Sequence, residues 1–94
     1  MRIIEDLELG QELYYARILP SVGYFELLDI KIRSLTDTWF ACIDKKTKQA
    51  YLFHDRDLGV SVFINRNVAL DLVRKAEKEF KSKGVVFTED SESI

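Results

Sequence analysis

The residues best suited to chemistry are one histidine and one cysteine. His54 opens the run His54-Asp55-Arg56-Asp57, in which a carboxylate could orient the imidazole as a general base or share a metal ion with it. Adjacent strand residues point to opposite faces, however, so His54 and Asp55 do not converge by themselves. Neither a second histidine nor a cysteine lies nearby, and aspartate commonly stabilises turns. We interpret this run as a loop, and we expect no catalytic residue, no metal site and no cofactor.

Cys42 is the only cysteine and lies in an apolar run. As a nucleophile it would need a base such as His54, whereas a free cysteine in apolar surroundings usually packs as a small hydrophobic residue. A single cysteine can form neither an internal disulfide nor a zinc thiolate cluster, which fits a reducing compartment. The N-terminus becomes acidic too early for a signal peptide, and no apolar run is long enough to span a membrane. We therefore expect a cytoplasmic protein with no membrane partner.

The charge of the chain is nearly balanced but unevenly distributed. Its 94 residues carry 14 basic and 16 acidic side chains, a net charge of -2, which is not typical of nucleic-acid-binding proteins. Residues 1–12 have a net charge of -3, residues 13–43 of zero, residues 44–83 of +4, and residues 84–94 of -3. The basic segment lies between two acidic ends.

Two groups of basic side chains in that segment could contact phosphates. One lies in a polar loop and the other on a helical face: Lys45, Lys46 and Lys48, and Arg74, Lys78 and Lys81. Small barrels bind nucleic acids by combining basic loops with exposed aromatic residues. Asp71, Glu77 and Glu79 interrupt the basic helical face. Nucleic-acid binding is therefore the alternative interpretation.

Aromatic residues near the starts of the expected strands favour a protein partner. The candidates are Tyr14, Tyr15, Tyr24 and Trp39, with Phe25 beside Tyr24. Strand alternation cannot bury Tyr14 and Tyr15 on one face, so we expect one of them to point outward. Exposed tyrosine and tryptophan are typical anchors of protein interfaces. Coverage by a barrel rim or by the N-terminal arm is the structural alternative.

Period-two patterning and turn residues position these candidates on a sheet. Leu28, Ile30 and Ile32 alternate with charged residues, which indicates a strand with one buried face. Aromatic and β-branched runs predict the remaining strands. The five expected strands cover residues 12–19, 24–35, 38–43, 50–54 and 60–64. Gly59 lies in the loop before the last strand, where we expect a positive φ.

A change to helical spacing follows the fifth strand. Asn65 is a suitable N-cap, and the apolar residues Ala69, Leu72, Val73, Ala76 and Phe80 recur at intervals of three and four. We expect a helix over residues 65–83, terminated by Gly84. Residues 85–87 could form a short strand or pack on the body. Residues 88–94 should form a flexible acidic tail, and residues 1–11 an acidic N-terminal arm or a first turn.

Together these elements predict a single α+β domain over residues 1–94. Consecutive strands joined by short turns favour a meander. We expect a five-stranded antiparallel curled sheet, or an SH3-like small barrel, with one C-terminal amphipathic helix. A chain this small leaves no room for a large nucleotide-binding fold or a two-domain cleft.

Residues 48–70 resemble small, uncharacterised prophage and conjugative-element proteins of Gram-positive bacteria. The resemblance is carried by a strand, a glycine loop, a Val-Phe strand end and a capped helix: Tyr51, Phe53, Gly59, Val62, Phe63, Asn65, Arg66, Ala69 and Leu70. Residues 9–15 are similar to the first strand of those proteins, so the likeness covers roughly residues 9–80. Asn65 departs from the usual threonine cap, and Asn67-Val68 replaces an acidic pair. The resemblance implies a mobile-element accessory protein without catalytic residues.

Three hypotheses follow. The first is a non-enzymatic protein that binds a host or mobile-element protein, with inhibition of a host defence complex as one use. The second is a nucleic-acid-binding regulator that uses the 45–48 loop and the basic helix face. The third is a small enzyme or metal protein centred on His54. Homo-oligomerisation is left open by the sequence.

Overall fold

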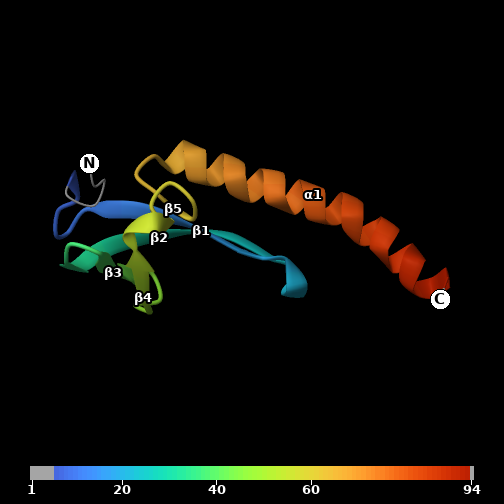
Figure 1. Ribbon diagram of the computed structural model, residues 1–94, viewed down its shortest axis with the longest axis horizontal. Coiled ribbons are helices and arrows are strands. Elements are labelled where there is room, and N and C mark those ends of the chain that lie inside the picture. Colours follow the sequence, from blue (N-terminus) through green and yellow to red (C-terminus); the bar gives the residue numbers. More distant parts are fainter. Residues whose placement is uncertain (1–5, 94) are drawn as a thin grey trace.

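The computed structural model describes the backbone of residues 6–93 and the side chains of residues 6–82, and it contains one sheet and one long helix (Figure 1). The strands are β1 (Glu12–Leu19), β2 (Tyr24–Leu35), β3 (Trp39–Asp44), β4 (Ala50–His54) and β5 (Val62–Phe63). Two 3-10 turns, η2 (Pro20–Val22) and η3 (Asp55–Asp57), follow β1 and β4, and the helix α1 spans Arg66–Ser93.

The sheet is antiparallel, with the strand order β4-β3-β2-β1-β5. The predicted fold class, a curled five-stranded sheet with one C-terminal helix, is confirmed. The first four strands form the expected meander, but β5 returns to the far side of the sheet and pairs with β1 through Tyr14 and Phe63. The backbone N–H of Ala16 donates to the carbonyl of Ser61 at 2.8 Å, which extends this pairing beyond β5 itself.

The inner, concave face of the sheet holds the main core. In β2, Leu28, Ile30 and Ile32 are at most 7% exposed, as their alternation predicts. They pack with residues from every other strand and from two loops: Leu7, Leu13, Phe40, Cys42, Phe53, Leu58 and Val62. Leu7 belongs to the predicted acidic arm, so this part of the arm contributes to the core instead of lying free.

Helix α1 covers part of the outer face. It packs on β1, β2 and β5, with Ala69 and Val73 buried against Ala16 and Phe63. Figure 1 shows the helix running along one side of the sheet, with β4 on the other side. Among the described elements, the helix therefore makes its main contacts away from β3 and β4.

The predicted end of the helix at residue 83 is wrong. The helix continues past Gly84 to Ser93, so residues 85–87 form no strand and residues 88–93 are helical. A single glycine inside a helix costs only about 1 kcal/mol relative to alanine, and no proline follows it here. Gly84 is therefore tolerated within the helix. Residue 94, the last residue of the predicted tail, lies outside the described residues.

Gly59 has the positive φ expected from the sequence, at +87°. A Cβ built on Gly59 would meet nothing within 4 Å, so only the backbone conformation disfavours a side chain there. We expect Gly59→Val to lower the free energy of unfolding by about 1 kcal/mol or more, because a β-branched residue is strained in the left-handed region. Gly59→Asn should lower the free energy of unfolding less, because asparagine tolerates the left-handed region better than valine does. Urea denaturation compares the two variants, and equal stability would contradict the strain argument.

Candidate protein-binding surfaces

His54 is part of a turn that uses its polar groups locally. Its backbone N–H donates to Oδ2 of Asp57 at 2.9 Å, and its side chain accepts a hydrogen bond from the backbone N–H of Asp57. This reciprocal cap starts the 3-10 turn η3, which agrees with the loop interpretation of residues 54–57. Within the part of the chain that the structure describes, no group of three or more histidine, cysteine or acidic side chains is arranged to hold a metal ion.

Cys42 and His54 lie on opposite faces of the sheet. Cys42 is 1% exposed in the inner core, and burial raises the pKa of its thiol to about 12. His54 is exposed and pairs across the ladder with Trp39, which shares the outer face. A thiol with this pKa is almost wholly protonated at neutral pH, and the sheet separates it from the imidazole. The two residues are therefore not arranged as a nucleophile and its base.

The lysine loop between β3 and β4 is shaped by Asp44. This aspartate is 4% exposed, and its Oδ1 accepts hydrogen bonds from the backbone N–H groups of Lys46 at 2.7 Å and Thr47 at 3.1 Å. Lys45 reaches across the outer face to Oε2 of Glu12 at 3.1 Å, and this hydrogen bond raises the pKa of Lys45. One of the three loop lysines is thus already paired with an acidic side chain.

The two predicted basic groups lie over different parts of the sheet. The loop joins β3 and β4, whereas α1 packs on β2, β1 and β5. On the helix, Nζ of Lys81 lies 3.8 Å from Oε2 of Glu77. Arg74 and Lys78 are exposed. The structure does not bring the lysine loop and the basic helix face together. Their role in nucleic-acid binding stays a prediction.

Tyr14 and Tyr15 point to opposite faces, and each is half-buried. Tyr15 makes edge-on ring contacts on the inner side with Tyr51 and Phe53, at centroid distances of 5.4 and 4.9 Å. Tyr14 packs against the residues beneath the helix, in the cluster that contains Val73. Helix and core therefore cover much of both rings.

Tyr24 and Trp39 are also half-buried. The guanidinium carbon of Arg17 lies 5.1 Å from the ring centre of Tyr24. Partial burial, followed by a hydrogen bond with Glu26, raises the pKa of Tyr24. The same guanidinium carbon lies 5.8 Å from the ring centre of Tyr51, which contacts Tyr15, so a chain of ring and guanidinium contacts joins Tyr24 to Tyr15 on the inner face. Tyr14 and Trp39 lie on the outer face, so the structure does not bring all four predicted aromatic anchors together. Their role in protein binding stays a prediction.

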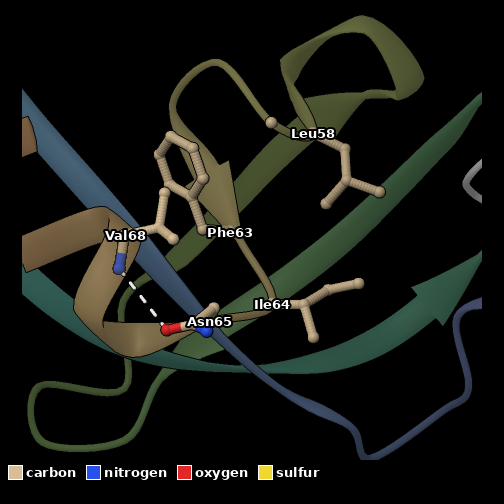
Figure 2. A pocket seen from close by; sticks show the side chains of 6 residues that line it. Leu58, Phe63, Ile64, Asn65 and Val68 are labelled. Carbon is tan, nitrogen blue, oxygen red and sulfur yellow. Dashed lines mark hydrogen bonds between the residues drawn. The ribbon is translucent and has the colours of Figure 1, made fainter.

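An apolar recess lies between β5 and the start of α1 (Figure 2). Its volume is about 230 Å³, and it is lined by Leu58, Gly59, Phe63, Ile64, Asn65 and Val68. Three aliphatic side chains in or beside this stretch are largely exposed: Val60 at 66%, Ile64 at 51% and Val68 at 49%. We call this recess the β5–α1 pocket. The sequence analysis does not predict this pocket, because it assigns all of residues 60–64 to one short apolar strand.

Local turns explain why this apolar run reaches the surface. Asp57 accepts hydrogen bonds from the backbone N–H groups of Val60 and Ser61, which holds both residues in a turn before β5. At the other end, Oδ1 of Asn65 accepts a hydrogen bond from the backbone N–H of Asn67 at 2.8 Å. This bond caps the start of the helix. Only Val62 and Phe63 remain in the strand, so Val60 and Ile64 are left outside the core.

A second recess lies where α1 passes the turn η2. Its volume is about 250 Å³, and it is lined by Pro20, Ala76, Glu79 and Phe80. The Phe80 ring packs against Phe25 at a centroid distance of 5.2 Å and is 37% exposed. Glu79 makes this recess less apolar than the β5–α1 pocket.

Comparison with known proteins adds no relative. No protein-family model matches the chain, and neither a curated protein nor a solved structure was found to be similar to it. Among the described residues, no helix combines the length and the apolar content that a membrane crossing requires. The function is therefore argued from the chain's own surfaces.

Proposed function

We propose that this is a non-enzymatic binding protein whose β5–α1 pocket receives an apolar side chain of a protein partner. The observation that carries the proposal is the pocket together with the exposed aliphatic side chains of Val60, Ile64 and Val68. Apolar side chains seated in small pockets and surrounded by further contacts are typical centres of protein interfaces. Clustered apolar exposure of this kind is also uncommon on a surface without a partner.

The chemistry of the pocket supports a protein partner over a small-molecule substrate. Its volume of about 230 Å³ is below the roughly 300–1,000 Å³ typical of small-molecule sites. Asn65 is the one polar side chain among its lining residues, and its oxygen already caps the helix. The lining therefore offers little to orient a polar substrate, but it suits an aliphatic or aromatic anchor.

Nucleic-acid binding is the second candidate. It is supported by the exposed loop lysines Lys46 and Lys48 and by the exposed helix residues Arg74 and Lys78. Binding of this kind should weaken steeply as salt is raised. A mobile-element origin and the inhibition of a host defence complex rest on the sequence resemblance alone and stay predictions.

Val68→Glu tests the pocket, with Arg74→Glu as its matched control on the same helix. A carboxylate at the pocket should weaken binding of a captured partner about thirtyfold or more, because the anchor side chain would meet an uncompensated charge. Partners captured from a host lysate with the wild-type protein are identified, purified and titrated by calorimetry against both variants, whose folding is checked by circular dichroism.

The control separates the two candidate functions. Arg74→Glu should leave a protein partner's affinity within about twofold, since surface charges away from an interface contribute little. If Arg74→Glu abolishes binding and Val68→Glu does not, the pocket is not the site and the basic helix face is favoured. A partner that binds both variants as tightly as the wild type would also refute the pocket.

A further inference from the structure

Strand β4 forms one edge of the sheet. The backbone hydrogen bonds at its two ends show which of its residues bond to β3. The N–H of Asp44 donates to the carbonyl of Gln49 at 2.8 Å, and the N–H of Asp55 donates to the carbonyl of Thr38 at 3.0 Å. In an antiparallel ladder, residues alternate between bonding the neighbouring strand and facing away from it. Tyr51 therefore bonds to β3, as does Phe53. The backbone groups of the residues between and beside them, Ala50, Leu52 and His54, point to the open side.

Local hydrogen bonds cover two other backbone groups that point out from the edges of the sheet. At the end of β4, the outward N–H of His54 is taken by Asp57. On the opposite edge, the carbonyl of Val62 accepts from the N–H of Gly59 at 2.7 Å. Among the described residues, no such local hydrogen bond covers Ala50 or Leu52, and the Leu52 side chain is 62% exposed. Edge strands normally carry a charge, a proline or a bulge at such a position, because an open apolar edge pairs with other strands.

We propose that a second copy of this chain pairs with β4 across a two-fold axis centred on Leu52. In this antiparallel register, Leu52 exchanges both backbone hydrogen bonds with the same residue of the second copy. The N–H of Ala50 then reaches the carbonyl of His54 across the axis. The two sheets become one continuous sheet. This association is independent of the β5–α1 pocket, which lies at the opposite edge of the sheet.

Charge supports the antiparallel orientation over the parallel one. The hairpin end of β4 carries Lys46 and Lys48, whereas the other end carries Asp55 and Asp57 with one cation, Arg56. Parallel pairing would gather the lysines of both copies at one end and their aspartates at the other. Antiparallel pairing places each lysine end beside an aspartate end of the second copy, so opposite net charges face each other.

The helix leaves room for this arrangement. It packs on β1, β2 and β5, and Figure 1 shows it on the side of the sheet away from β4. The Leu52 side chain lies on the outer face with Trp39, Ala41 and Ile43, as strand alternation requires. Pairing at the edge brings the two Leu52 side chains together on that face and covers these exposed apolar side chains.

The sharpest variant is Leu52→Pro, with Leu52→Thr as its control. Because the N–H of residue 52 points outward, proline there removes a donor from the open edge without removing a bond to β3. Threonine keeps the donor and favours a strand, but shortens the apolar side chain. Two backbone hydrogen bonds are lost per dimer with proline, so its dissociation constant should rise about thirtyfold, clearly more than with threonine.

Sedimentation equilibrium from low-micromolar to millimolar protein measures the association, and circular dichroism checks that both variants fold. Amide hydrogen exchange on the wild type gives a readout that needs no variant. At high concentration the Leu52 amide should become as slow as that of Tyr51, whereas on dilution it should exchange like an open amide. A wild-type chain that stays monomeric at millimolar concentration overturns the proposal and leaves the edge to a strand of another protein. A dimer that Leu52→Pro does not weaken overturns it as well.

Discussion

Phe40→Ala should remove about 4 kcal/mol from the free energy of unfolding, a large part of the stability expected for a domain of this size. Phe40 is fully buried on β3, at the centre of the inner core. Its ring lies 5.5 Å from that of Phe53, so truncation removes an aromatic contact as well as buried apolar area. Thermal unfolding followed by circular dichroism should show a midpoint roughly 20 °C lower.

Two comparisons make this result specific to core packing. Phe40→Leu fills most of the same space and should cost about 1.5 kcal/mol or less. Leu52→Ala removes an exposed apolar side chain and should change stability by no more than about 0.5 kcal/mol. A loss below about 1 kcal/mol for Phe40→Ala would show that the inner face is not closed around this ring.

The inner core could be predicted because its pattern is local. In β2, apolar and charged residues alternate, so Ile30 faces the core and Lys31 faces solvent whichever strands lie beside them. The same rule places Tyr14 and Tyr15 on opposite faces. It cannot say what covers each face. Here Tyr14 points to the outer face, as expected, and packs against the cluster beneath the helix, while two aromatic rings pack on Tyr15, so both side chains are half-buried.

The β5–α1 pocket could not be predicted because it depends on non-local pairing. An apolar run such as residues 60–64 is typical of a buried strand when read alone. In the structure, pairing with β1 uses only Val62 and Phe63, and the turn at Gly59 and the cap at Asn65 occupy the flanking residues. An apolar run directly between a turn glycine and a helix cap is the signal that points to exposed flanking residues.

Burial along helix α1 also depends on non-local packing, which the sequence does not show. Its apolar stripe was predicted correctly, yet exposure rises along it from 0% at Ala69 through 6% at Val73 to 37% at Phe80. Spacing defines the face of a helix, but not how far the sheet beneath it extends. The pocket lies at the well-covered end, so its shape depends on docking of the first turns of α1.

Val73→Asp tests whether the pocket depends on docking of α1. This variant should lower the free energy of unfolding by about 3 kcal/mol or more at neutral pH. Val73 is buried against Ala16 and Phe63. The helix positions three and four residues away from it carry no cation: Ala69, Leu70, Ala76 and Glu77. An unpaired buried charge is among the most costly single changes. Val73→Thr is the matched control, since it has a similar shape without the charge and should lose only about 1–2 kcal/mol.

The pH dependence separates the charge from the lost packing. Burial raises the pKa of the introduced carboxyl above its unfolded value of about 3.9, so the unfolded chain loses the proton first as pH rises. The difference from Val73→Thr should therefore nearly vanish below about pH 4, grow as pH rises from there to the raised folded pKa, and stay constant above it. Urea unfolding of both variants at several pH values measures this, and a difference independent of pH would refute burial of this position. If α1 must dock to form the pocket, Val73→Asp should also weaken partner binding at neutral pH, and lowering the pH should restore both properties together.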